Sequence, residues 1–260
     1  MQKIPLLLSM IAGLTISVQP IFAGGIALQT PSGLHAGDTF RFVFVTDTVT
    51  TATNPNASYY DAIVNNEAIS LGVTYQSQSL NWQAIVGTQD ANAITHIGSS
   101  NHDQVYRVDG AKVATSTDTS PGGLWSGSLL NAINLDLAGN RPENPRSFLT
   151  GHVWTGTNQH GTAETWNLPY NYSMGSADGV SVGGIFYDPL FQYDPTDQSW
   201  ADQNGSGQSL PESLYGISQE LTVPGATSVP EPSTLALMGL GGIGLAIRFH
   251  LRRKAAVKNS

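Results

Sequence analysis

The long uncharged apolar stretches of this chain lie at its two ends, and this placement confines any folded domain to the residues between them. Ile4 to Val18 is apolar and follows Lys3, whereas Thr234 to Ile247 contains no charged residue. Both ends are typical of addressing segments rather than of a fold. Removing them leaves roughly 200 residues, which is enough for one domain with a sizeable core.

The first 23 residues are predicted to form a signal helix that is removed on export. Lys3 supplies the positive n-region, and Ile21-Phe22-Ala23 places a small residue at the cleavage point. The alternative is a retained N-terminal anchor. The shortness of the apolar run and the break at Pro20 favour the signal peptide.

Composition excludes several classes of function. The chain contains no cysteine, so it has no thiol nucleophile and no thiolate metal site, and its core must be held by burial alone. The predicted domain carries 18 acidic residues and five basic ones, which gives a formal charge of about -13. Such a surface repels phosphate backbones, so nucleic acid is excluded as an expected partner.

Hydrophobic patterning predicts an α+β domain with short strands. Phe40 to Thr46 is a β-branched and aromatic run of strand length, and Leu80 to Val86 alternates between apolar and polar residues. Asp109-Gly110 predicts the turn of a hairpin between residues 105–108 and 111–114. Further strands are expected at residues 153–156 and 213–218, the last of these beside the first strand.

One longer helix and one short helix are expected. Ser58 and Asp61 are spaced as a helix cap, and Gly72 follows the last apolar position. The intervening apolar residues form one stripe at helical spacing, namely Tyr60, Ile63, Val64, Ala68 and Leu71. Residues 90–97 are predicted to form the second helix.

The C-terminal region combines three features in a fixed order. Val229-Pro230-Glu231-Pro232-Ser233 is followed by the uncharged run and then by a basic cluster. The prolines keep the backbone extended so that a processing enzyme can grip it, and the basic cluster favours a cytoplasmic end. That cluster comprises Arg248, Arg252, Arg253 and Lys254.

The bland alternative is an ordinary single-pass anchor. The uncharged run from Ser233 has 15 residues, and a helix of that length spans about 22 Å. A hydrocarbon core is about 30 Å thick, so the run is short for a permanent span. The four glycines between Gly239 and Gly244 also weaken it as a permanent helix. A transient, cleavable anchor is therefore favoured.

This constellation resembles the PEP-CTERM sorting signal of exosortase substrates. The resemblance implies that the exported chain is held in the inner membrane, cut near Pro230-Glu231-Pro232 by exosortase, and released to the cell surface or to extracellular polysaccharide. The three motif residues are then substrate residues rather than catalytic ones. The predicted organisation is a signal peptide over 1–23, an extracytoplasmic domain over 24–223, a linker with the motif over 224–232, a membrane helix over 233–251, and a basic tail over 252–260.

The domain resembles uncharacterised bacterial surface domains that look like C-type lectins. The resemblance is carried by Trp82-Gln83-Ala84-Ile85, Val105 to Gly110, Leu124-Trp125-Ser126-Gly127 and Val153 to Thr157. It implies a loop-rich fold with short antiparallel strands and one or two helices. The disulfides of lectins and their Glu-Pro-Asn or Gln-Pro-Asp tripeptides are absent, and Trp166-Asn167 is followed by Leu168, so calcium-dependent sugar binding is not implied with the fold.

A loop in which acidic and aromatic residues alternate is the candidate ligand-binding segment. Oxygen ligands at short spacing can hold calcium, and exposed aromatic rings can stack on sugars, but the sequence contains no EF-hand register. The alternatives are a solvated acidic loop and aromatic residues that pack the loop onto the core. The candidate residues are Tyr187, Asp188, Tyr193, Asp194, Asp197, Trp200 and Asp202.

No pattern in the sequence indicates a catalytic site. His152, His160 and Glu164 match neither a zinc-protease helix nor a hydrolase elbow, and the same holds for His96 and His102. We therefore expect a non-enzymatic surface or matrix protein without an obligatory cofactor, which binds exopolysaccharide. The alternatives are a secreted polysaccharide hydrolase and a purely structural matrix component.

Overall fold

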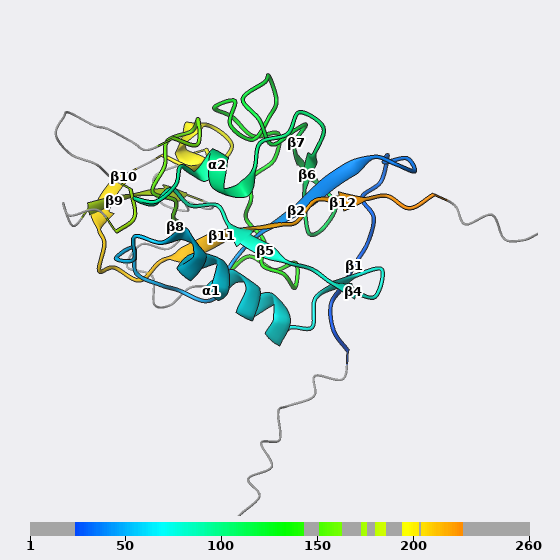
Figure 1. The fold of residues 1–260 in the computed structure, drawn as a ribbon, viewed down its shortest axis with the longest axis horizontal. Coiled ribbons are helices and arrows are strands. Elements are labelled where there is room, and N and C mark those ends of the chain that lie inside the picture. Colours follow the sequence, from blue (N-terminus) through cyan, green and yellow to red (C-terminus); the bar gives the residue numbers. More distant parts are fainter. Residues whose placement is uncertain are drawn as a thin grey trace, which may run out of the picture.

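The fold is α+β, with one mixed sheet between a long helix and a layer of loops (Figure 1). The structure is a computed structural model that describes residues 24–142, 151–162, 173–175, 180–185, 194–202 and 204–225. The predicted signal helix and membrane helix lie outside these ranges. The elements are β1 (Ala27–Leu28), β2 (Thr39–Val45), α1 (Ala57–Ser70), β3 (Thr74–Tyr75), β4 (Gln78–Ser79), β5 (Trp82–Ala84), α2 (Ala93–Ile97), β6 (Gln104–Arg107), β7 (Lys112–Ala114), β8 (His152–Trp154), β9 (Val180–Ile185), the 3₁₀ turn η1 (Gln198–Trp200), β10 (Asn204–Gly207), β11 (Ser213–Ser218) and β12 (Leu221–Thr222).

The main sheet is mixed, which corrects the prediction of antiparallel strands. Its order in the described residues is β10-β9-β8-β11-β2-β6-β7, with β12 paired to β2 and β5 paired to β11. The β11–β8 and β2–β6 pairs are parallel. A crossover is needed to bring two strands together in parallel. The segment from α1 to α2 provides it between β2 and β6, and the segment containing β9 and β10 provides it between β8 and β11.

The predicted strands are confirmed in position. β5 and β11 fall within the expected runs, β2 and β8 overlap theirs but begin one residue earlier, and β6 and β7 form the hairpin around Asp109-Gly110. β11 pairs with β2 through Tyr215 to Ile217 opposite Val45 to Val43, so the expected pairing of these two runs is present, although β1 precedes β2 and β12 follows β11. The similarity to C-type lectins is not tested by these observations.

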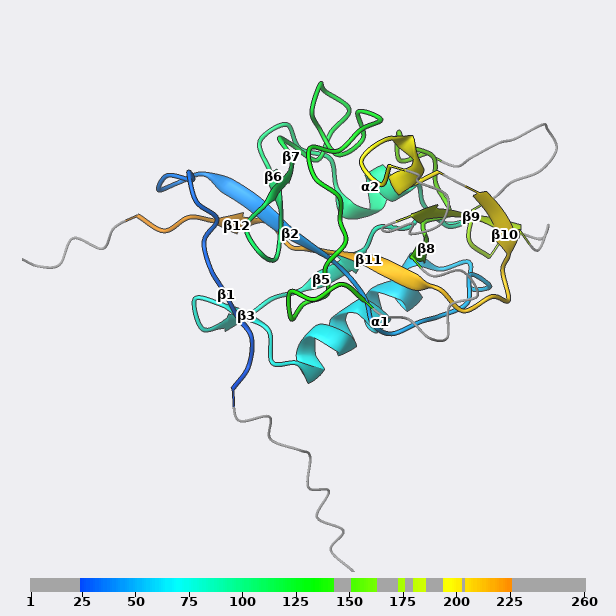
Figure 2. The same cartoon turned by 180° about the vertical axis from the view of Figure 1, so that it is seen from behind.

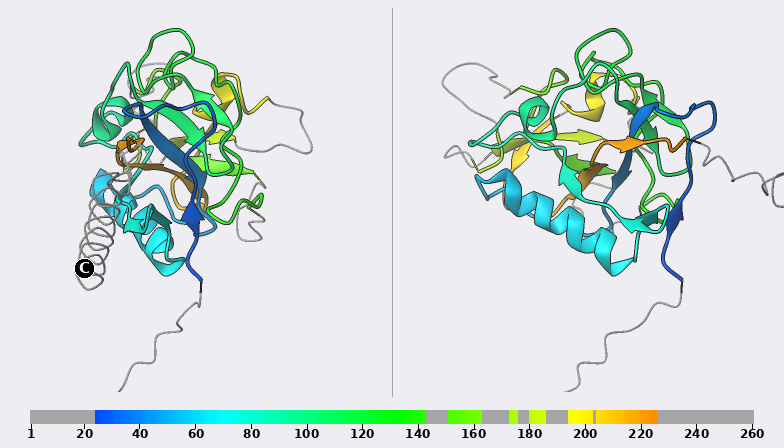
Figure 3. Two further views of the ribbon diagram at one scale, coloured as in Figure 1. Left: turned by 90° about the vertical axis from the view of Figure 1, so that its right-hand side faces the viewer. Right: turned by 45° about the vertical axis from the view of Figure 1, so that its right-hand side comes forward.

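Both faces of the sheet are buried, and successive side chains of β2 point alternately into the core on one face and the core on the other. Phe40, Phe42 and Phe44 pack into the core beneath α1, whereas Val43 and Val45 pack into the core on the opposite face. Figure 3 shows α1 on one side of the sheet, and α2 with the green loops on the other. Four Trp residues complete these two cores, namely Trp82 and Trp154 on the α1 side and Trp125 and Trp200 on the other.

α1 begins two residues before the predicted start. Its N-cap is Asn56, which makes no side-chain cap bond, so the prediction of Ser58 as the cap is wrong. Asp61 cannot complete a cap at Ser58 because its Oδ1 accepts a hydrogen bond from the Ala84 N–H at 2.7 Å. The C-terminal end is as predicted, since Gly72 follows Leu71 with a φ of 62° and donates to the Ile69 carbonyl at 3.0 Å.

The first described strand, β1, is an edge strand of a second, smaller sheet. β1 pairs in parallel with β3, and β3 pairs with β4. Figure 2 shows this sheet next to the C-terminal end of α1, away from β9 and β10. β12 and the exit of the chain lie in the same half of the molecule (Figure 1).

Gly216 of β11 leaves room for side chains of β2 and α1, and we expect Gly216→Ala to destabilise the fold. A Cβ at this position would collide with the buried side chains of Phe44 and Val64. Overpacking of this kind costs about 1–3 kcal/mol. The free energy of unfolding in urea should fall by that amount.

Gly207→Ala is the matched control for this substitution. Gly207 also lies in a strand, but no atom lies within 4 Å of its added Cβ. We expect its free energy of unfolding to stay within about 0.5 kcal/mol of wild type. An equal loss in both variants would show that the contact with α1 is not the cause.

Candidate functional site

The predicted sorting segment follows a strand that fastens the end of the domain. β12 pairs with the start of β2, and the next residue, Val223, donates to the Asp38 carbonyl and accepts from the Gly37 N–H, each at 2.9 Å. Gly225 is the last described residue. The predicted motif Pro230, Glu231 and Pro232 and the basic residues Arg248, Arg252, Arg253 and Lys254 lie outside the described residues.

The acidic side chains of the predicted ligand loop shape turns. Asp194 Oδ1 accepts from Thr196 N at 2.8 Å and from Thr196 Oγ1 at 2.6 Å, and these bonds hold the pKa of Asp194 below its ordinary value. Asp197 Oδ1 accepts from Ser199 N at 2.7 Å and caps η1. Both residues are exposed, whereas Asp202 is half-buried and donates its N–H to the Gln198 carbonyl.

Trp200 is not available for stacking on a ligand. It is 0% exposed, and its ring lies 5.3 Å from that of Trp125 and 5.9 Å from that of Tyr215. Trp200 therefore packs the loop onto the core, which was the alternative role expected for the aromatic residues of the loop. Tyr187, Asp188 and Tyr193 lie outside the described residues, so the loop as a whole stays a prediction.

Within the described ranges, no three His, Asp or Glu side chains gather closely enough to hold a metal ion. Asp194 and Asp197 already direct carboxylate oxygens at backbone N–H groups of their own turns. Three of the seven predicted loop residues lie outside these ranges. Calcium binding by the loop therefore stays a prediction.

The described histidines make structural contacts. His160 lies at the surface, with its Nδ1 3.3 Å from the Trp125 carbonyl oxygen, and Glu164 lies outside the described residues. His96 is the better-connected residue, because its Nε2 lies 2.9 Å from Asp61 Oδ1 and both side chains are mostly buried. This pair ties α2 to α1, and the 35-residue separation of its members gave no local signal in the sequence.

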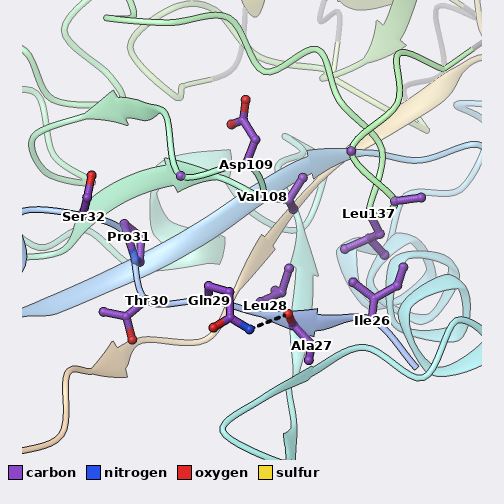
Figure 4. Close-up of a pocket in the computed structure, with 13 residues that line it drawn as sticks. Ile26, Ala27, Leu28, Gln29, Thr30, Pro31, Ser32, Val108, Asp109 and Leu137 are labelled. Atoms are coloured by element: carbon purple, nitrogen blue, oxygen red, sulfur yellow. Dashed lines mark hydrogen bonds between the residues drawn. The ribbon is translucent and has the colours of Figure 1, made fainter. Parts of the chain in front are cut away.

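A pocket of about 470 Å³ lies between β1, the β6–β7 turn and the segment 137–139 (Figure 4). Its apolar wall is formed by Ile26, Leu28, Val108 and Leu137, as Figure 4 shows. Gln29, Thr30, Ser32 and Asp109 add amide, hydroxyl and carboxylate groups around it. An apolar wall with a few polar groups at its edge is the usual composition of a small-molecule site. No motif in the sequence indicated this pocket.

The single carboxylate among the described lining residues is paired. Arg107 Nε donates to Asp109 Oδ1 at 2.9 Å, and Arg107 Nη2 donates to Asp109 Oδ2 at 2.7 Å. The hydrogen bonds and charge of Arg107 lower the pKa of Asp109. Arg107 is itself fixed by the Ala132 carbonyl and Asn134 Oδ1. Asp109 is therefore a rigid hydrogen-bond acceptor rather than a proton donor.

The carboxyl group of Asp47 lies near two other acidic side chains, those of Glu67 and Asp136. Glu67 of α1 accepts from Asp47 N at 3.0 Å and from Thr48 N at 2.9 Å, while the carboxyl groups of Asp47 and Asp136 share a hydrogen bond. Asp136 Oδ1 also accepts from Asn140 N at 2.7 Å and so shapes the segment 136–140. Burial, together with the charges of Asp136 and Glu67, raises the pKa of Asp47 to about 6.

The described lining of the pocket holds one carboxyl group, that of Asp109. A glycoside hydrolase needs two carboxyl groups on either side of the scissile bond. The pocket presents Asp109 alone, and that residue is neutralised by Arg107. The Asp47 and Asp136 pair lies outside the residues that line the pocket.

Comparison with known proteins identifies the C-terminal segment. Residues 228–254 match the PEP-CTERM protein-sorting motif. The chain is thus similar, in about its last tenth, to proteins that exosortase sorts, and the predicted recognition is confirmed. No curated protein matches the chain.

The motif implies that the protein is exported and that its precursor is anchored in the membrane until exosortase processes it. None of the helices in the described ranges is long and apolar enough to span a membrane. The predicted membrane segment, residues 233–251, is not part of those ranges.

The raised pKa of Asp47 predicts that the domain loses stability as the pH rises from about 4 to about 6. The folded state binds its proton more tightly than the unfolded state, so the penalty for ionising Asp47 is complete above pH 6. Asp47→Asn removes this penalty. We expect the variant to be more stable than wild type at pH 7.5 by about 1 kcal/mol after solvent screening is allowed for. Thermal melts should then show a Tm higher by about 2–4 °C.

Asp109→Asn provides a control of opposite sign. Because the pKa of Asp109 is lowered in the folded state, ionised Asp109 stabilises the fold at any pH above its pKa in the unfolded chain. This stabilisation is lost as the pH falls. The variant should be less stable than wild type at pH 7.5, with the difference shrinking as the pH falls through the lowered pKa of Asp109. A rise in Tm for both variants at pH 7.5 would mean that lower net charge, not the local carboxyl cluster, is responsible.

Proposed function

We propose that the chain is an exosortase substrate whose acidic domain acts at the cell surface or in the extracellular matrix. The match of residues 228–254 to the sorting motif carries this proposal. The fold supports it, because β12 completes the domain and fastens it just before the motif begins. The folded domain can then remain intact while the tail is cut.

The domain is proposed to bind rather than to catalyse. Its pocket offers hydroxyl, amide and carboxylate groups beside apolar side chains, and the carboxylate is locked by Arg107. Hydroxyl-rich polymers can be recognised by such groups, which exchange hydrogen bonds with sugar hydroxyls. Extracellular polysaccharide is therefore the proposed ligand class.

The two other functions make different demands on the same pocket. A secreted hydrolase would need a second carboxyl group or a histidine within reach of the bound sugar, and no such residue is found among those that line the pocket in the described ranges. A purely structural component would need no pocket at all. The polar groups around the pocket thus favour the binding function.

Processing can be followed in the native host by the size of the protein in membrane and extracellular fractions. We expect replacement of Pro230, Glu231 and Pro232 by alanine to leave full-length protein in the inner membrane, because the extended recognition segment is lost. Deletion of the host exosortase should give the same result. Release of a shortened protein in both cases would contradict the proposal.

Ligand binding can be tested on a glycan array with the secreted domain, with and without calcium. Ala138 lines the pocket and is exposed, so Ala138→Trp should fill the pocket without entering the core. We expect binding to exopolysaccharide fragments to fall about tenfold or more, equivalent to about 1.4 kcal/mol. Ala62→Trp, on the exposed face of α1, is the matched control and should bind as wild type does.

Equal binding by the Ala138→Trp variant and wild type would place the ligand elsewhere. Binding that requires calcium would instead support the acidic loop that contains Asp194 and Asp197. No binding by wild type to any fragment would favour the structural alternative.

A further inference from the structure

The last described strand fixes the point at which the chain leaves the domain. Leu221 and Thr222 of β12 pair with Phe40 and Thr39, and Leu221 is buried in the core beneath α1. Val223 adds one hydrogen bond in each direction to the turn at residues 35–38. That turn is closed by His35 N, which donates to Asp38 Oδ2 at 2.7 Å. Val223 is therefore the last residue anchored on both its N–H and its carbonyl group within the described part of the chain.

The number of residues after this anchor sets a strict upper limit on distance. Six residues, Pro224 to Val229, separate Val223 from Pro230. Seven steps of fully extended chain cover at most about 25 Å, whatever conformation they adopt. A folded domain of roughly 200 residues has a radius of gyration of about 16 Å, hence a diameter of about 40 Å. The greatest possible distance between Val223 and the motif is therefore smaller than the diameter of the domain.

We propose that β12 holds the folded domain close to the extracytoplasmic face of exosortase during processing, with the turn 35–38 and β12 facing the enzyme. This inference rests on the proposed processing and adds a steric requirement to it. The enzyme must reach Pro230 within a gap of at most about 25 Å. Processing then depends on the length of the spacer between Val223 and the motif.

The charge of this face favours a protein partner over adsorption to lipid. Among the described residues, the exposed or half-buried ionisable ones near the exit are His35, Asp38, His102 and Glu220, and none of them is Lys or Arg. Binding to anionic lipid relies on clusters of Lys and Arg. Figure 1 shows the chain leaving beside β12, at the opposite end of the sheet from β9 and β10. The β9–β10 end is therefore directed away from the enzyme.

Deletion of residues 225–228 from the full-length precursor tests the requirement. We expect the rate of conversion to the released form to fall about tenfold or more, equivalent to about 1.4 kcal/mol in the barrier. Replacement of the same four residues by Gly-Ser-Gly-Ser keeps the length and is the matched control, with a rate expected to equal that of wild type. Resistance of the precursors to protease confirms that each domain is folded.

A second variant distinguishes spacer length from other effects of the deletion. Val223→Pro removes the N–H that bonds to Asp38, so it frees the chain one or more residues earlier. Combined with the deletion, it should restore part of the lost processing rate. Normal processing of the deletion variant, or equal failure of the Gly-Ser replacement, would overturn the steric requirement. Release of the wild-type chain from an exosortase-deficient host would instead overturn the proposed function itself.

Discussion

The pairing of β2 with β11 is the constraint on which the rest of the domain depends. It joins Val43 to Val45 with Tyr215 to Ile217, so the two strands enclose almost the whole domain sequence. Bringing such distant segments together costs conformational entropy that only a large buried core can offset. The chain has no cysteine to secure the closure covalently. Both faces of the central pair are consequently filled by side chains that are almost fully buried.

The pair also determines where the remaining elements can lie. β5 and β8 occupy successive parts of the outer edge of β11, and β6 and β12 extend the two edges of β2. On the face opposite α1, Arg41 reaches from β2 to Asp103 Oδ2 at 3.1 Å and to the Ile97 carbonyl at 2.7 Å. This ion pair is buried and hydrogen-bonded, which is the condition under which a buried charge is tolerated. It fixes α2 relative to the sheet.

Elements with strong local patterns could be predicted from the sequence. Strands whose close contacts require glycine could not, because glycine weakens the strand pattern. The aromatic alternation of β2 and the Asp109-Gly110 turn are local signals, and the structure contains both. β9 was missed because Gly183-Gly184 weakens the strand pattern, although Gly184 is required where the Trp200 backbone passes. β10 has the sequence Asn-Gly-Ser-Gly, which favours a turn, and it is extended by its pairing with β9. The sorting motif was fully predictable because its three parts are contiguous, whereas the pocket and the Asp47, Glu67 and Asp136 group are assembled from distant segments.

The late position of β11 and β12 links folding to the order in which an exported chain crosses a membrane. A chain that crosses with its N-terminus first delivers β2 early, but β2 remains without its central neighbour until about residue 218 has emerged. The apolar faces of β2 are therefore exposed through most of the crossing. The uncharged C-terminal run follows within a few tens of residues. Under the proposed processing, the domain closes its core at almost the same moment as its tail reaches the bilayer, so a chain held there finishes folding before exosortase cuts it.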